Sequence, residues 1–164
     1  MKGRILNIAK VKPQKWSHGK SYEAEIRWAG YQMGSRKLGF NVTVLPPGKR
    51  AFPFHAHLTN EELFFVLEGR GTIRIGRTAH RIGEGDFISL PPGPASAHQI
   101  VNTSNAPLRY LAVSTMEVPE VADYPESGKL GVFTGTAPGR PGGKGAIRHW
   151  TRRADGVDYW DGED

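Results

Sequence analysis

The sequence predicts an all-β fold, an antiparallel sandwich or barrel, on three observations. Short apolar runs recur between residues 22 and 115, and Gly or Pro separates most of them. The chain has 21 Gly and 12 Pro among 164 residues, which is typical of many turns rather than of a helix bundle. Regularly spaced short strands favour antiparallel pairing over βαβ units.

The first expected strands come before the central region. Residues 22–28 place Tyr22, Ala24, Ile26 and Trp28 on one face, which is the period-2 pattern of a half-buried strand. Residues 37–45 alternate in the same way and end at two prolines and a glycine, which close the strand. A possible short strand covers residues 4–8, and residues 12–21 are expected to form a polar loop.

Short strands joined by glycine turns are expected through the centre of the chain, at residues 62–67, 72–75, 79–82, 87–90, 97–102 and 108–115. Beyond them the character changes. Residues 117–128 are expected to form an ordered loop, 129–133 a possible strand and 134–145 a flexible linker. The last residues carry Trp150, Tyr159 and Trp160, which are costly to leave in water, so this segment is expected to dock; a disordered charged tail is the alternative.

Length and composition predict one domain over residues 1–164, with a core at about 37–116, an N-terminal arm at 1–36 and a C-terminal extension at 117–164. The net charge of +6 permits an anionic ligand, but Lys and Arg are scattered, so no nucleic-acid partner is expected. Neither a signal peptide nor a stretch of transmembrane length is recognisable, and a cytoplasmic protein without membrane contact is expected.

A candidate metal site lies within residues 48–69. His55 and His57 stand two residues apart in a segment that is expected to be extended, so both side chains point to one face and can grip one ion. Glu62 follows as a carboxylate, and Glu61 is its rival. The chain has no cysteine, which leaves histidine and carboxylate as the strong ligands.

Two segments resemble the two signature motifs of the cupin superfamily. In the first motif the spacing from the histidine pair to Glu62, and from Glu62 to Gly69, is matched, while Gly48 sits one residue early. The second motif has Gly85, Pro91 and Gly93 at their usual spacing, followed by His98 and Asn102, with two additional residues before the histidine.

The resemblance implies a double-stranded β-helix, or jelly roll, in which His55, His57, Glu62 and His98 bind one divalent transition metal. Imidazole with one carboxylate suits Zn, Ni, Fe or Mn and is poor for Ca or Mg. The family spacing selects Glu62 over Glu61. The other histidines, His18, His80 and His149, lack such partners and are expected to have surface or packing roles.

Strand parity extends the site into a pocket. If Glu62 points inward, Phe64 and Val66 do so too, and Ile100 and Asn102 accompany His98. These residues are expected to form an apolar wall, although plain core packing explains Phe64 and Ile100 equally well.

A finer resemblance joins segments such as LPPGPASAHQIVN, DYPESGK and DYWDGE to a subgroup of small cupins provisionally named sugar phosphate isomerases. It implies a metal-dependent isomerase acting on a sugar phosphate or a related small polar substrate, with no catalytic residue identified. The alternatives are an Fe-dependent dioxygenase and a non-catalytic protein that binds a carbohydrate or an organic acid. Lys49, Arg50 and Arg109 are candidates to clamp phosphate, and a homodimer is expected because terminal segments can cover exposed sheet edges.

Overall fold

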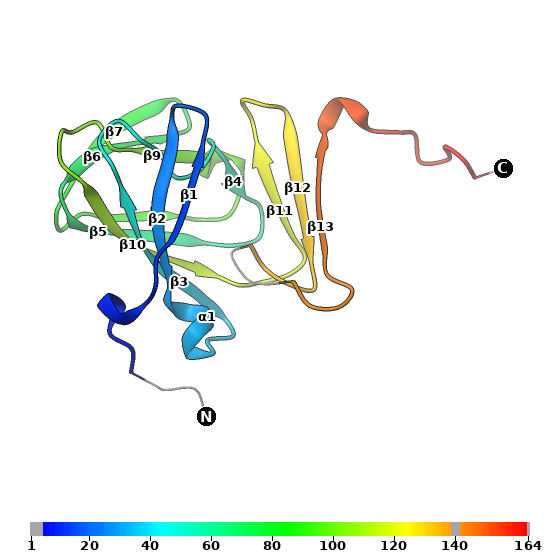
Figure 1. Cartoon of the computed structure of the whole chain (residues 1–164). Helices are drawn as coiled ribbons and strands as arrows, with labels where there is room; N and C mark the ends of the chain where they lie inside the picture. The colour runs from blue at the N-terminus through cyan, green and yellow to red at the C-terminus, as the bar shows by residue number, and fades with distance from the viewer. Residues whose placement is uncertain (1–4, 139–141, 164) are drawn as a thin grey trace.

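The computed structural model describes residues 5–138 and 142–163. Its strands form three sheets in which neighbouring strands run antiparallel, with the orders β1-β2-β3-β10-β5-β8, β13-β12-β11-β4 and β7-β6-β9 (Figure 1). The strands are β1 (Gln14–His18), β2 (Tyr22–Trp28), β3 (Leu38–Leu45), β4 (Ala56–His57), β5 (Glu62–Glu68), β6 (Arg70–Ile75), β7 (Thr78–Gly83), β8 (Phe87–Leu90), β9 (His98–Val101), β10 (Leu108–Thr115), β11 (Glu120–Tyr124), β12 (Lys129–Thr134) and β13 (Ile147–Arg152). The predicted all-β jelly-roll fold is confirmed.

The N-terminal arm differs from the prediction. Residues 12–21 contain β1, which pairs with β2 along its whole length, and Gly19 with a φ of 56° lies in the turn between them. All five residues of β1 are exposed, so no alternation of apolar and polar side chains marks this strand in the sequence. The strand predicted at residues 4–8 is also wrong, because a 3₁₀ turn occupies Ile8–Lys10; residue 4 lies outside the described residues. A short helix, α1 (Ala29–Met33), follows β2.

The C-terminal extension contributes three strands to a sheet, and β12 confirms the strand predicted at residues 129–133. The segment 117–128 contains β11, which pairs with β12 on one side and β4 on the other. The segment predicted as a flexible linker connects β12 to β13, which pair along six residues; residues 139–141 of it lie outside the described residues. Tyr159 and Trp160 contact each other at 4.8 Å but stay 83% and 71% exposed, and Figure 1 shows this end leading away from the barrel.

The core lies between the six-stranded and three-stranded sheets and is built from aliphatic side chains, with Leu45, Val66 and Leu108 fully buried. Asn102 is buried among them and donates through Nδ2 to two carbonyl oxygens, at 2.8 Å each, of Leu45 and Ala106. Since a buried amide is costly without partners, Asn102 is a structural residue that ties the end of β9 to β3.

None of the helices in the described part of the chain has both the length and the apolar character needed to cross a membrane.

Candidate metal centre

Each of the three sheets brings a candidate ligand to one place. His57 ends β4, Glu62 begins β5 and His98 begins β9. His55 precedes β4 and forms a bridge with His98, in which each backbone nitrogen donates to the other's carbonyl oxygen at 3.1 and 2.7 Å. This bridge holds the first histidine segment beside the second, which lies more than forty residues later in the chain.

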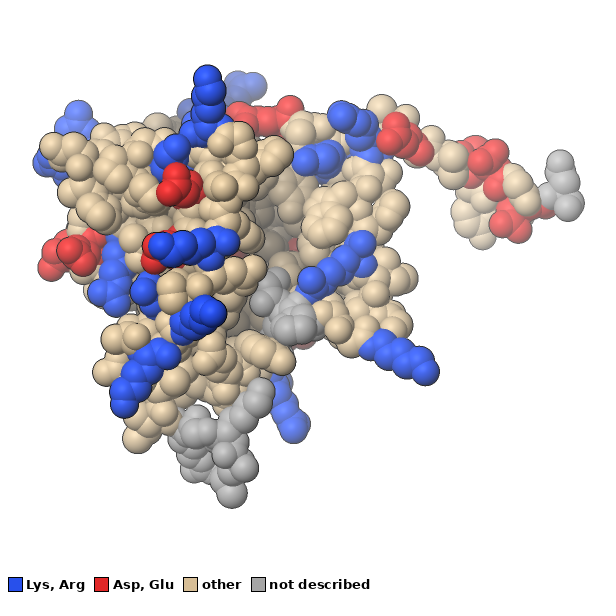
Figure 2. Space-filling view, viewed as in Figure 1, with Lys and Arg blue, Asp and Glu red and all other residues tan. Residues whose placement is uncertain are grey.

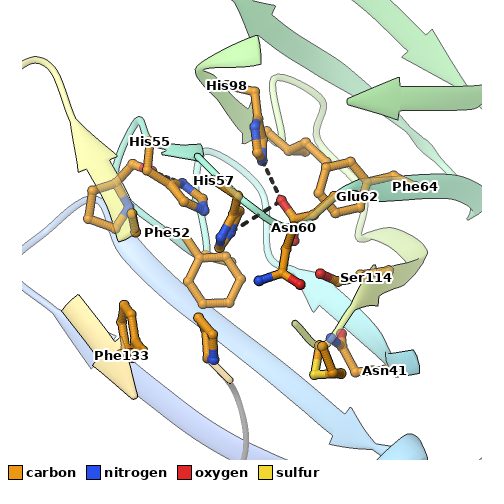
Figure 3. A pocket seen from close by; sticks show the side chains of 18 of the residues that line it. Asn41, Phe52, His55, His57, Asn60, Glu62, Phe64, His98, Ser114 and Phe133 are labelled. Atoms are coloured by element: carbon orange, nitrogen blue, oxygen red, sulfur yellow. Dashed lines mark hydrogen bonds and ion pairs between the residues drawn. The ribbon is translucent and has the colours of Figure 1, made fainter. Parts of the chain in front are cut away.

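The side chains converge at the inner end of a pocket. One ligand atom from each of His55, Glu62 and His98 lies within 4.8 Å of the other two, a cluster that can hold a metal ion. Glu62 Oε2 lies 3.2 Å from His98 Nε2 and 3.5 Å from His57 Nε2 (Figure 3). All four predicted residues are therefore brought together, with His57 beside the three-residue cluster.

Hydrogen bonds from the far nitrogen of two imidazoles, those of His55 and His98, orient these rings. His55 Nδ1 lies 2.8 Å from the carbonyl oxygen of Pro53, and His98 Nδ1 lies 3.0 Å from that of Ser96. A carbonyl oxygen only accepts, so both Nδ1 atoms carry the proton. The Nε2 atom of each ring is left with its lone pair directed toward the cluster, as a metal ligand requires.

The pKa values agree with this picture. Burial and the neighbouring His98 lower the pKa of His55 to about 3, so this imidazole is neutral. Burial alone would raise the pKa of Glu62, but the proximity of His98, whose Nε2 lies 3.2 Å away, and of His57 and His55 outweighs it and lowers that pKa to about 2. Glu62 Oε2 is buried and has no hydrogen-bond partner that satisfies it, which fits a carboxylate oxygen that awaits a cation.

Glu120 is a further residue of the site that the sequence interpretation missed. Its side chain is fully buried, and Oε1 lies 3.6 Å from His57 Nδ1 while accepting a hydrogen bond from the backbone nitrogen of Leu58 at 3.0 Å. Its other oxygen accepts from the backbone nitrogen of Asn60 at 2.9 Å and from the Asn60 amide. A carboxylate facing Nδ1 favours the proton on that nitrogen, so His57 also presents Nε2 to the cluster.

The two additional residues of the second motif also have a defined position. They fall in a 3₁₀ turn, Pro94–Ser96, that lies between Gly93 and β9. Ser96 in this turn supplies the carbonyl oxygen that accepts from His98 Nδ1. The insertion thus leaves the ligand strand in register and orients its histidine.

The pocket has a volume of about 300 Å³, and Figure 2 shows a hollow between the barrel and the C-terminal strands. As predicted, Phe64 and Ile100 line it; Val66 and Asn102 are buried in the core and do not. The C-terminal extension closes one side with residues that the sequence interpretation did not place there: Ala122, Tyr124, Phe133, Arg148 and Trp150.

The phosphate-clamp candidates lie elsewhere. Lys49 donates to the carbonyl oxygen of Lys20, Arg50 donates to Gln99, and neither these two nor Arg109 lines the pocket. Arg148 is the only Lys or Arg among the described lining residues.

Comparison with known protein families identifies the segment that carries the candidate ligands. The family model described as "Cupin domain" matches residues 41–114, the segment that carries all four candidate ligands. Residues 41–114 of the chain form a cupin domain. The match ends at residue 114, so Glu120 and the C-terminal strands that close the pocket lie outside the matched region.

The curated proteins that match this chain include the following two. An uncharacterised protein of Methanocaldococcus jannaschii is 35% identical over 78 residues, which are 48% of this chain and 60% of that protein. Glucose-6-phosphate isomerase of Thermococcus kodakarensis is 34% identical over 89 residues, 46% of each chain. The alignments thus span only about half the length of these relatives.

A solved structure resembles this cupin over nearly its whole length. The protein, from Acidithiobacillus ferrooxidans, is provisionally named a sugar phosphate isomerase and is 25% identical, with a TM-score of 0.78 that covers 94% of this chain and 95% of that one. The C-terminal sheet is therefore part of the resemblance.

Proposed function

We propose that His55, His57, Glu62 and His98 hold one divalent transition metal, Zn, Ni, Fe or Mn, at the inner end of the pocket. The observation that carries the proposal is the orientation of the three imidazoles. Nδ1 of His55 and of His98 lies at hydrogen-bond distance from a backbone carbonyl oxygen, and Nδ1 of His57 lies 3.6 Å from Glu120 Oε1. Nε2 of His98 and of His57 lie 3.2 and 3.5 Å from Glu62 Oε2. Three imidazole nitrogens and one carboxylate form a donor set of borderline softness. The metal, when bound, supplies a Lewis acid that polarises a substrate oxygen.

The first candidate reaction is isomerisation of a small hydroxy-carbonyl compound. The names of the Thermococcus kodakarensis and Acidithiobacillus ferrooxidans proteins support this class, and sugar phosphates are the substrates that those names suggest. The pocket would contribute a mostly apolar lining that limits water around the reacting atoms.

The second candidate is an Fe-dependent dioxygenase, and a specific observation favours it. An isomerase needs a group that moves a proton, yet the described lining residues include no carboxylate or histidine besides the four ligands. The pKa of Tyr124 is raised by burial, which makes its hydroxyl a poor base at neutral pH. A protein that binds a carbohydrate or organic acid without turnover is the remaining alternative.

Purified protein is expected to carry about one equivalent of a transition metal per chain, because one four-ligand site binds one ion. Elemental analysis measures this directly. Loss of substrate deuterium to solvent without oxygen uptake supports the isomerase, whereas iron with oxygen uptake supports the dioxygenase. Protein that contains no metal and takes up none from Mn, Fe, Co, Ni or Zn solutions would contradict the proposed site.

A single-domain, cytoplasmic homodimer stays a prediction. Its support is the terminal segment, where Val157, Tyr159 and Trp160 are each more than two thirds exposed and do not pack on the described barrel. Sedimentation equilibrium is expected to give twice the chain mass, and a shortened chain ending at residue 156 is expected to dissociate more readily. A monomer at micromolar concentration would count against the dimer.

A further inference from the structure

We infer that the pocket takes a ligand with an aromatic or similarly bulky apolar body and one oxygen-bearing head, in preference to a polyhydroxylated sugar phosphate. The head would lie at the ligand cluster, and this part rests on the proposed function. The preference for an aromatic or bulky apolar ligand body depends only on the side chains that line the pocket.

Large aromatic side chains from most of the surrounding elements form that lining. Phe64 stands beside the candidate ligands, where its ring is 5.5 Å from that of His98 (Figure 3). On the opposite side the ring of Trp150 packs edge-on against Phe133, with centroids 5.5 Å apart. The rings of Trp28, Phe40 and Phe52 also line the pocket, together with those of three tyrosines, Tyr31, Tyr110 and Tyr124. Aromatic surfaces of this kind favour flat apolar groups and accept few hydrogen bonds from hydroxyls.

The polar side chains of the pocket are largely occupied. Asn60 donates through Nδ2 to the carbonyl oxygen of Glu117 and to Glu120, and its Oδ1 accepts from Thr115 Oγ1 and from the backbone nitrogen of Glu117. Gln99 accepts from Arg50 and donates to the carbonyl oxygen of Phe52. Asn60 thus uses both N–H groups and both lone pairs of its oxygen within the protein, whereas Gln99 uses one N–H and one lone pair.

Three hydroxyl groups of the pocket also form hydrogen bonds within the protein. Tyr110 is hydrogen-bonded to Thr43, and Tyr124 to Trp150. Ser114 donates its hydroxyl proton to the carbonyl oxygen of Thr115 at 2.9 Å. A sugar carries a hydroxyl on most of its carbons, and the amides and hydroxyls of the pocket, which already bond within the protein, have partners left for only some of them.

A phosphate group would also be poorly met. Arg148, the only Lys or Arg among the described lining residues, is exposed and lies on β13 at the edge of its sheet. Recognition of a phosphate dianion usually combines several cationic or backbone donors. One rim arginine is better suited to a single negative charge near the mouth.

Isothermal titration of the metal-loaded protein with two α-hydroxy acids tests the preference. Lactate and 3-phenyllactate share one chelating head and differ only in the body. We expect 3-phenyllactate to bind about 10- to 100-fold more tightly, as burial of a phenyl group allows. We expect fructose 6-phosphate to bind no more tightly than lactate. Equal affinity for the two acids, no binding of either, or tighter binding of fructose 6-phosphate would overturn the inference.

A matched pair of tryptophan variants places the effect in the pocket. Trp150→Ala removes a lining ring and is expected to lower affinity for 3-phenyllactate at least about 5-fold while leaving lactate unchanged. Trp160→Ala removes an exposed ring outside the pocket and is expected to change neither. Identical effects of the two variants would contradict the assignment.

Elemental analysis of the protein used for titration shows whether a negative result counts against the proposed metal centre or against the ligand preference inferred here. Absence of metal counts against the proposed centre, and the two acids are then still compared in the metal-free protein, since the body preference needs only the lining. A metal-loaded sample that prefers fructose 6-phosphate counts against this inference alone.

Discussion

Changing Glu62 to alanine is expected to reduce bound metal from about one equivalent per chain to less than about 0.1. Glu62 is the only carboxylate in the ligand cluster, and its Oε2 lies within 3.5 Å of both His57 and His98. The variant therefore removes the one anionic ligand, which neutralises the cation and brings the three imidazoles around it. His57→Ala is expected to lower occupancy strongly as well, because it removes one of those nitrogens.

The fold is expected to survive both changes, because burial of aliphatic side chains such as Leu45, Val66 and Leu108 holds the barrel together rather than the ion. Elemental analysis and circular dichroism on the same samples measure the two effects. Glu61→Ala is the matched control, since Glu61 is exposed, does not line the pocket and is expected to retain full occupancy. Full metal content in both the Glu62 and His57 variants would refute the site.

Changing Glu120 to glutamine is expected to destabilise the protein by about 2–4 kcal/mol and to weaken metal binding about 10- to 100-fold. Both carboxylate oxygens face donors: Oε1 faces Leu58 and His57, and Oε2 faces both nitrogens of Asn60. In either orientation of the new amide, its NH₂ group would meet donors. The variant keeps the shape of the side chain, so loss of packing does not account for the effect.

Urea denaturation of the metal-free protein measures the stability term, and competition with a chromophoric chelator measures metal affinity. Glu117→Gln makes the same chemical change on an exposed side chain three residues earlier and is expected to alter neither quantity by more than about 0.5 kcal/mol. If the Glu120 variant lost stability but bound metal with native affinity, Glu120 would be a structural residue only and not one that orients His57.

A comparison of individual strands shows where the local sequence pattern was enough to predict a strand and its bounds. β2 and β10 agree with their predicted bounds because one or both faces are buried and the apolar pattern records it. β1 was missed because all five of its residues are exposed, so its partner and not its composition makes it a strand. β11 was missed in a segment rich in Pro and acidic residues, where Glu120 is buried only because β4 and β12 pair on either side of it.

The sequence by itself determined the cupin fold and the four candidate ligands, because a metal site depends on residue type and fixed spacing, which the chain records directly. Only the tertiary structure decided what surrounds them. Glu120 behind His57, and the aromatic wall that Phe133 and Trp150 complete, come from an extension that joins the barrel through backbone pairing. Backbone hydrogen bonds do not depend on side-chain identity, so no sequence motif indicates which residues they bring to the pocket.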